Sequence, residues 1–152
     1  MEHPLSQFRY CPKCGSEHFD IHNEKSKQCK DCGFVYYFNP SSASVALILN
    51  KQNELLVCRR AKEPAKGTLD LPGGFIDMAE TGEEGVTREV KEETGLDVKD
   101  AEGGYMFTYK RENPGEGDNY FVDVYRFVMD IDENDVSFQE AEIDGYMFAT
   151  KE

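Results

Sequence analysis

Two Cys-x-x-Cys pairs near the N-terminus constrain the folding of this 152-residue chain more than any other feature of its sequence. Residues 1–38 contain little apolar material, and a segment that small cannot hold itself together by burying side chains alone. Cys11 and Cys14 form the first pair, Cys29 and Cys32 form the second, and a glycine follows each pair. Four thiolates in two such turns supply the complete tetrahedral ligand set of a structural zinc ion. We therefore predict a small domain built around zinc.

Two alternatives stay open for this segment. The four cysteines could instead be reduced thiols or form two disulfides, and His18 and His22, which lie between the pairs, could compete as ligands. Because a full set of four cysteines is already present, we interpret both histidines as surface residues. Cys58 follows an apolar run on a predicted strand and is interpreted as a buried thiol without chemistry.

Charge and hydropathy argue against several classes of function. The formal net charge of −13 argues against a nucleic-acid polymer as partner, because such binding depends on clustered Lys and Arg. The longest apolar run, at residues 45–49, is too short to span a bilayer. The N-terminus has neither the basic nor the apolar region of a signal peptide. We expect a cytoplasmic protein that has no membrane partner.

Hydrophobic patterning predicts a second, larger domain over residues 39–152. A helix is expected over residues 81–94, because Thr81 and Glu84 form a capping-box pair at its start and Gly95 follows its end. Apolar stretches between turn-rich segments predict β-strands, the first two joined in a hairpin. These strands are expected at residues 43–49, 54–60, 103–112, 119–131 and 145–150.

Three glutamates crowd onto one side of the predicted helix. At about 100° per residue, Glu89, Glu92 and Glu93 fall within one arc of about 100°. At about 5 Å in a half-buried cleft, each pair would repel by on the order of 3 kcal/mol. Arg88 lies one turn before Glu92 and can hold that carboxylate, but one guanidinium does not balance three acids. The three glutamates are also typical of a solvated acidic helix face. The alternative is that they bind hard divalent cations, and the loop that precedes the helix favours this second interpretation.

The segment from Gly74 to Leu96 resembles a complete Nudix box over 23 residues. In this segment Gly74 is followed after five residues by Glu80 and, after seven more, by the run from Arg88 to Leu96 ("REVKEETGL"). The preceding four-cysteine segment resembles the zinc ribbon of the NADH diphosphatase and ADP-ribose diphosphatase branch. The resemblance implies an α/β (α+β) fold, the Nudix α/β/α sandwich around a mixed sheet. The predicted domains are then a zinc ribbon over residues 1–38 and a Nudix hydrolase domain over residues 39–152.

The resemblance also implies an activity, the Mg²⁺- or Mn²⁺-dependent hydrolysis of the diphosphate linkage in a small nucleoside diphosphate derivative. ADP-ribose, NADH or another dinucleotide, and a nucleotide sugar are the expected substrates. Carried onto this chain, Glu89 and Glu93 would be the main metal ligands and Glu92 a further ligand or outer partner. Arg88 would orient these glutamates, and Glu80 would reach back to hold the loop or the helix.

Further roles follow from the same resemblance. The Gly73 carbonyl would add a metal ligand, while Gly73 and Gly74 would let the chain approach the metal and the diphosphate closely. The glutamate that takes the proton from water differs among family members, and we favour Glu89. Such families often add one glutamate from a later loop. Glu140 and Glu142 are the candidates here; spacing does not decide between them, and we favour Glu140.

The sequence departs from the family pattern in two ways. It has no Trp, and therefore lacks the Trp-containing Ser-Gln-Pro signature of the NADH diphosphatase branch. It also lacks the helix that usually ends the domain, so either the chain is truncated or a partner subunit, as in a homodimer, covers that face. Aromatic residues in the later strands form either a base-stacking wall or part of the core. They are Tyr105, Phe107, Tyr109, Tyr120 and Tyr125.

The alternative function is that of a non-catalytic Nudix-fold module that binds a nucleotide or a protein and regulates. Binding-only relatives tend to lose the acids of the box, whereas this chain keeps Arg88, Glu89, Glu92 and Glu93. The box therefore favours an enzyme.

Overall fold

The computed structural model describes residues 2–38, 42–63, 65–113, 115, 119–139 and 141–150. The chain divides into two compact units, Met1–Pro40 and Ser41–Glu152, which we call the cysteine unit and the sheet unit. Residues 39–41 lie outside the described part of the chain, so the boundary between residues 38 and 39 stays a prediction.

The cysteine unit is a three-stranded antiparallel sheet with a very small core. Its strands are β1 (Phe19–Asn23), β2 (Ser26–Cys29) and β3 (Val35–Tyr37), in the order β1-β2-β3. Phe19 packs in the core with two of the cysteines and with the partly buried Phe34. So little apolar burial agrees with the need for a metal to stabilise this unit.

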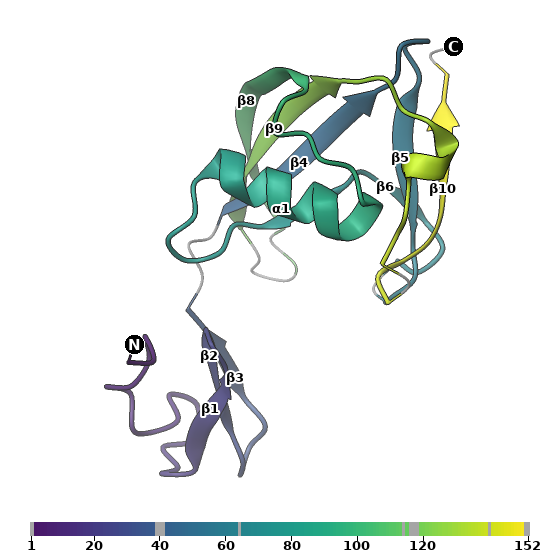
Figure 1. Ribbon diagram of the computed structural model, residues 1–152. Coiled ribbons are helices and arrows are strands. Elements are labelled where there is room, and N and C mark those ends of the chain that lie inside the picture. The colour runs from purple at the N-terminus through teal and green to yellow at the C-terminus, as the bar shows by residue number, and fades with distance from the viewer. Residues whose placement is uncertain are drawn as a thin grey trace. The chain divides into compact units, whose positions relative to one another are not determined.

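The sheet unit is built on a mixed sheet (Figure 1). The strand order is β10-β5-β4-β9-β8, with β6 paired to β5 and β7 paired to β4. β4 and β9 run parallel, and the other described pairings are antiparallel. The strands are β4 (Ser42–Leu49), β5 (Leu55–Arg60), β6 (Leu69–Asp70), β7 (Gly73–Phe75), β8 (Glu102–Arg111), β9 (Tyr120–Val128) and β10 (Ile143–Ala149). The predicted mixed sheet and its hairpin at the β4–β5 turn are confirmed.

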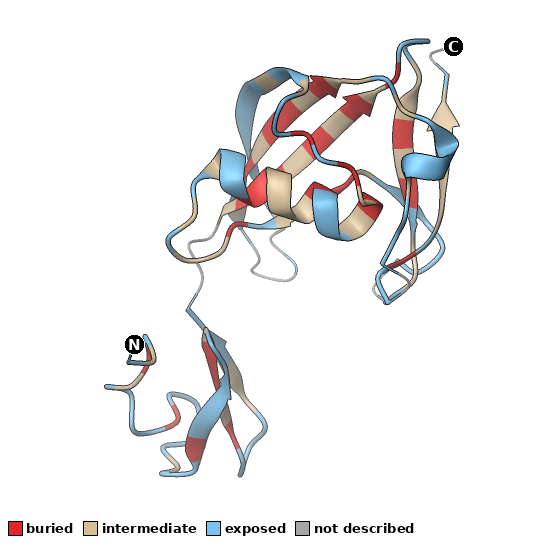
Figure 2. Ribbon diagram, in the orientation of Figure 1, coloured by how far each residue is buried: buried red, intermediate tan, exposed pale blue. Residues whose placement is uncertain are grey.

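One helix, α1 (Gly82–Thr94), covers one face of this sheet (Figure 1). A short 3₁₀-helix, η1 (Glu133–Asp135), precedes β10. Ala46 and Ile48 of β4 are fully buried against Val86 and Val90 of α1. Buried residues accordingly line β4 and β9 behind the helix in Figure 2. The α+β class and the predicted helix are confirmed.

The side chains that alternate with these buried ones along the strands lie on the opposite face of the sheet. Val45, Leu47 and Leu49 of β4 are half-buried there, and Phe107 and Met147 are exposed. In the described residues α1 is the only α-helix, so the second helical layer of the predicted sandwich has no counterpart among them. No helix of the described residues has the length and apolar character needed to cross a membrane.

Candidate active site

Local sequence fixes both ends of α1. The Thr81 hydroxyl accepts a hydrogen bond from the Glu84 N–H at 3.2 Å, and the Glu84 carboxylate accepts one from the Thr81 N–H at 2.7 Å. Gly95 takes a left-handed conformation with φ of 76°, and its N–H donates to the Lys91 carbonyl. Because the helix starts and stops at fixed residues, the direction of each glutamate on it is also fixed.

Arg88 lies at the centre of a hydrogen-bond network that joins α1 to the preceding loop. Its Nε and Nη2 atoms donate to the two carboxylate oxygens of Glu80, at 3.1 and 2.8 Å. Its Nη1 atom donates to Oε1 of Glu89 at 2.8 Å and to Oε2 of Glu92 at 3.3 Å. Nη2 also donates to the Phe75 carbonyl at 3.1 Å. Arg88 therefore lies where a residue that orients the glutamates must lie.

Glu80 connects the loop to the helix. Besides binding Arg88, its Oε1 atom accepts a hydrogen bond from the Asp77 N–H at 2.6 Å. The hydrogen bonds from Arg88 hold the pKa of the Glu80 carboxyl below its usual value. A Cβ atom at Gly85 would come within 3.1 Å of Glu80 Oε1, so this glycine leaves room for the bridge.

Glu93 is a largely buried acid without a cationic partner. Its Oε2 atom accepts a hydrogen bond from the Gly73 N–H at 2.9 Å. Burial, together with the nearby charges of Glu89 and Glu142, raises its pKa to about 8. Among the described residues, no Lys or Arg forms an ion pair with Glu93. Ionised Glu93 therefore lacks an ion-pair partner among the described residues.

The two glycines of β7 each make room for a neighbour. A Cβ atom on Gly73 would lie 2.1 Å from the Ser44 carbonyl oxygen, so only glycine lets β7 lie this close to β4. A Cβ atom on Gly74 would lie 2.5 to 2.7 Å from the three carboxyl atoms of Glu89. The carboxyl of Glu89 thus occupies the place of a Gly74 side chain. Burial raises the pKa of Glu89, and Arg88 opposes this effect.

The other candidate acids are placed less uniformly. The Glu92 side chain is 52% exposed and reaches Arg88 but not the buried acids. Glu142, in the segment before β10, lies near Glu89 and Glu93, whose pKa values its charge raises. Glu140, the residue that the sequence analysis favours, lies outside the described residues.

The four cysteines of the cysteine unit meet at one point. Their Sγ atoms all lie within 4.8 Å of one another, with 3.6 Å between Cys11 and Cys32 and between Cys14 and Cys29. Ligands about 2.3 Å from a tetrahedral zinc ion lie about 3.8 Å apart, so the spacing fits zinc. In the described part of the chain this is the only group of three or more His, Cys, Asp or Glu side chains gathered in this way.

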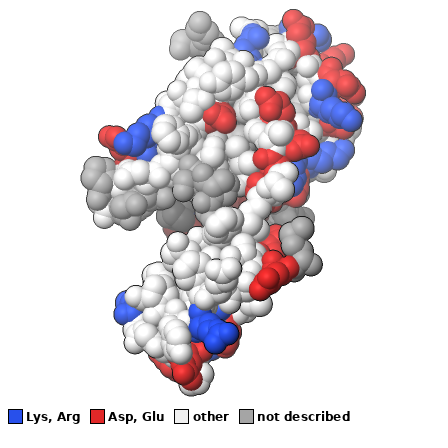
Figure 3. Space-filling model, turned by 90° about the vertical axis from the view of Figure 1, so that its left-hand side faces the viewer, with Lys and Arg blue, Asp and Glu red and all other residues white. Residues whose placement is uncertain are grey.

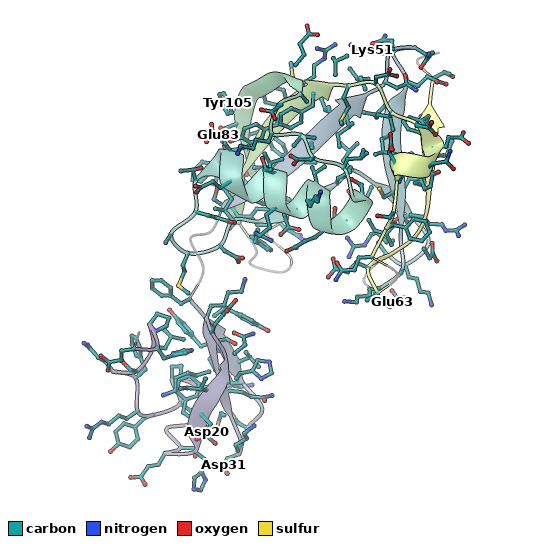
Figure 4. All side chains as sticks on the ribbon, in the orientation of Figure 1. Asp20, Asp31, Lys51, Glu63, Glu83 and Tyr105 are labelled. Carbon is teal, nitrogen blue, oxygen red and sulfur yellow. The ribbon has the colours of Figure 1, made fainter. Side chains whose placement is uncertain are left out.

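Glu93 and Glu142 line a polar cavity of ≈ 180 Å³, which we call the acidic pocket. Its walls include Gly73, Glu93, Glu142, Asp70 and the loop after β5, where Glu63 is labelled in Figure 4. Two cations also line it. Arg60 pairs with Asp70 at 3.3 Å, and Lys62 pairs with Glu142 at 3.6 Å. Cys58 is a further wall residue, and burial raises the pKa of its thiol to about 12.

A second cavity of ≈ 230 Å³, the aromatic pocket, shares Arg60, Asp70, Leu71 and Gly73 with the first. Phe75 and Tyr120 face each other in it, with ring centroids 5.0 Å apart. Arg111 lies over the Tyr120 ring, its guanidinium carbon 5.6 Å from the centroid. Since four residues line both cavities, the two are adjacent.

A larger hollow of ≈ 600 Å³ lies on the other flank of α1 and includes neither Glu89 nor Glu93. Figure 4 labels Glu83, which lines this hollow, and nearby Tyr105 at the same end of the unit. The five aromatic residues considered for a base-stacking wall do not form one surface. Tyr125 is in the core behind α1, with Tyr105 packed edge-on against it. Tyr109 and Tyr120 both line the aromatic pocket, and Phe107 packs against Tyr109.

Comparison with known proteins decides the family. Residues 39–152 match the family model described as the NUDIX domain. The chain belongs to the Nudix family. Residues 6–37 match the model of the NADH pyrophosphatase zinc ribbon domain, which agrees with the four converging Sγ atoms. Family and zinc ribbon, both expected from the sequence, are confirmed.

Curated Nudix relatives include three informative matches. A protein described as NAD-capped RNA hydrolase NudC from Haemophilus influenzae is 28% identical over 94% of this chain and 52% of its own length. NudC from Vibrio atlanticus is 34% identical over 63% of this chain and 35% of its own length. An ADP-ribose pyrophosphatase from Methanocaldococcus jannaschii is 50% identical over 40% of this chain and 35% of its own length. The chain thus spans about a third to a half of these relatives.

Solved structures support the Nudix fold. A MutT protein from Methanosarcina mazei is 28% identical, with a TM-score of 0.60 over 76% of this chain and 80% of that chain. A MutT Nudix hydrolase from Burkholderia pseudomallei is 21% identical, with a TM-score of 0.63 over 72% and 81%.

Several residues of the two pockets are not predicted by the sequence. Asp70 lies four residues before the Nudix box and Phe75 is its second residue, and this adjacency is the signal that could have found them. Arg60, Lys62 and Arg111 carry no such signal, because only the pairing of distant strands brings them to the pockets.

Proposed function

We propose that the sheet unit is a divalent-cation-dependent hydrolase that cleaves the diphosphate linkage of a small nucleoside diphosphate derivative. The observation that carries the proposal is that Glu93 and Glu142 line one cavity and Glu89 lies near enough for its charge to raise the pKa of Glu93, without enough positive charge to balance the three acids. Arg88 is already shared among three glutamates, and Lys62 pairs with Glu142.

The acids fit the cation that the family implies. Mg²⁺ and Mn²⁺ prefer carboxylate and carbonyl oxygens, and the site offers buried carboxylates whose pKa values are raised. Glu89 and Glu93 would hold the cation, with Glu142 and the Gly73 carbonyl as further ligands and Glu92 as an outer partner. When bound, the cation neutralises the phosphate oxygens and lowers the pKa of a coordinated water.

The other residues prepare the site. Arg88 fixes Glu89 and Glu92, and Glu80 fixes Arg88 to the loop, so the acids stay in place while substrate binds. Glu89 is our candidate for the residue that accepts the proton from water. Its position beside Gly74 places it next to the chain segment that would approach the diphosphate. Positioning and charge supply most of the rate in phosphoryl transfer.

The substrate class follows from the second pocket. A base or other flat group can stack against the exposed ring of Phe75, beside Tyr120, while Arg111 and Arg60 offer charge to phosphate or ribose oxygens. Because the two pockets are adjacent, one ligand that reaches across their shared wall can place its base in the aromatic pocket and its diphosphate at the acids. The matching relatives are described as acting on ADP-ribose and on NAD-capped RNA, which agrees with this class.

A second candidate substrate is a dinucleotide at the end of an RNA. The NudC relative from Haemophilus influenzae matches 94% of this chain, which favours its inclusion. On the face drawn in Figure 3 the described Lys and Arg residues lie in small separate groups. That arrangement and the net charge of −13 favour a small ligand over a long RNA. The absence of a nucleic-acid partner, the homodimer and the cytoplasmic location remain predictions.

The proposal is tested by a release assay with Mg²⁺ or Mn²⁺ over ADP-ribose, NADH, diadenosine polyphosphates, nucleotide sugars and a short NAD-capped RNA. Glu93→Gln should lose at least ~100-fold in kcat, because it removes a cation ligand. Glu83→Gln is the matched control, since Glu83 lies on the same helix outside the acidic pocket and should keep its activity. A wild type that binds ADP-ribose but hydrolyses nothing would support the non-catalytic module instead.

A further inference from the structure

The hydroxyl of Ser44 on β4 is buried and has no hydrogen-bond partner. Ser44 is 3% exposed, and in the described residues its Oγ is the only buried side-chain oxygen or nitrogen left in this state. A buried hydroxyl without a partner destabilises a fold, and such groups are rare in proteins. A partner that is present only in another state of the site would explain it.

The strand register shows what the hydroxyl faces. Ser44 is paired with Gly74 of β7, and directly paired residues of an antiparallel ladder project their side chains to the same face, about 5 Å apart. The place of a Gly74 side chain is filled by the Glu89 carboxyl, 2.5 to 2.7 Å from the Cβ position. Ser44 lies two residues before Ala46 and therefore on the same face of β4, and Ala46 packs behind α1. The hydroxyl and the Glu89 carboxyl are therefore neighbours beneath the helix.

Glu89 has one carboxylate oxygen to spare. Arg88 donates to Oε1 at 2.8 Å, whereas no hydrogen bond within the described residues reaches Oε2. A buried donor without an acceptor thus lies beside a carboxylate oxygen that accepts no hydrogen bond from the described residues. The other neighbour of Ser44 across the sheet is Asp123, but its Oδ1 atom already accepts a hydrogen bond from Thr108 at 2.5 Å.

We propose that Ser44 is a positioning residue whose hydroxyl donates to the Glu89 carboxylate when Glu89 holds the divalent cation. The proposal rests on the proposed cation site. A carboxylate that binds a cation with one oxygen keeps the other for a hydrogen bond, and such outer partners orient the ligand. The hydroxyl is unused while Arg88 alone holds Glu89, and it becomes satisfied when the site is loaded.

The test measures cation binding and stability separately. The full-length, zinc-loaded protein is titrated with Mn²⁺ by electron paramagnetic resonance, and its thermal midpoint is measured without Mn²⁺. Ser44→Ala should weaken Mn²⁺ binding by ~10-fold or more, as loss of an outer partner does, and leave the thermal midpoint unchanged or higher. Ser44→Thr, which keeps the hydroxyl, should recover most of the affinity. Ser42→Ala, a matched change on the same face of β4, should bind Mn²⁺ as the wild type does.

Each result has one meaning. Unchanged Mn²⁺ affinity in Ser44→Ala overturns the role of Ser44, and so does an equal loss of affinity in Ser42→Ala. Weaker Mn²⁺ binding together with a lower thermal midpoint in Ser44→Ala also overturns the role of Ser44, because the hydroxyl would then stabilise the fold itself. An equal fall of the thermal midpoint in Asp123→Asn would then identify Asp123 as the partner of the hydroxyl. Glu93→Gln gives the background of Mn²⁺ on other acids. A wild type that binds no more Mn²⁺ than this background overturns the proposed cation site as well.

Discussion

Glu93→Gln should make the stability of the cation-free protein less sensitive to pH. The pKa of Glu93 is raised from 4.5 to about 8, chiefly by burial. Below pH 4.5 the group is protonated in both the folded and the unfolded chain. Between pH 4.5 and about 8 the unfolded chain releases a proton that the folded chain retains, so the free energy of unfolding falls as pH rises. Above pH 8 both states are ionised and the loss is complete. Gln cannot ionise and should avoid this loss.

The expected size follows from the pKa values. Each pH unit corresponds to ~1.4 kcal/mol, so the two units between pH 6 and pH 8 correspond to at most about 2.7 kcal/mol. Solvent that reaches the partly exposed carboxyl screens the effect, and we expect about 1 to 2 kcal/mol. The pH range above 6 is chosen because the zinc thiolates must stay deprotonated.

Urea unfolding of zinc-loaded protein, followed by circular dichroism without added divalent cation, measures the effect. The curve of Glu93→Gln minus wild type should rise from pH 6 to pH 8, whereas Glu83→Gln minus wild type should stay flat, because Glu83 is exposed. Mg²⁺ at about 100 times its dissociation constant should restore about 2.7 kcal/mol to the wild type and little to Glu93→Gln. Parallel curves for Glu93→Gln and wild type would refute the argument that Glu93 is buried without a counter-charge.

Further substitutions test other contacts. Gly73→Ala should lower the free energy of unfolding by about 3 kcal/mol or more in urea, because its Cβ would lie 2.1 Å from a backbone oxygen that cannot move aside. The added Cβ atom of Gly74→Ala would contact only the flexible Glu89 carboxyl. Calorimetry should therefore show weaker Mn²⁺ binding, with a much smaller loss of stability than in Gly73→Ala. Equal losses of stability in the two variants would contradict this difference. Arg88→Lys loses the two-atom contact with Glu80, and kcat should fall by roughly 100-fold, with circular dichroism unchanged. A zinc chelator should collapse the amide NMR signals of residues 2–38; their persistence would show that the ribbon folds without metal.

Sequence by itself determined the parts of this protein that depend on neighbours along the chain. The two ends of α1 follow from Thr81, Glu84 and Gly95, because capping groups contact backbone atoms within one turn. The zinc ligands follow from two Cys-x-x-Cys turns, since each turn brings its own pair together. The Nudix box also places Arg88 within reach of Glu92 one turn later, as helix geometry requires.

Only the tertiary structure decided which distant residues complete the site. The pairing of β7 with β4 brings Ser44 beneath α1, and the pairing of β5 with β6 brings Arg60 to the acidic pocket. Tertiary structure also separated acids that look alike in sequence, since Glu93 is largely buried and Glu92 is exposed on the same helix. Burial and strand register depend on chain segments tens of residues apart, and spacing within one segment carries no information about them.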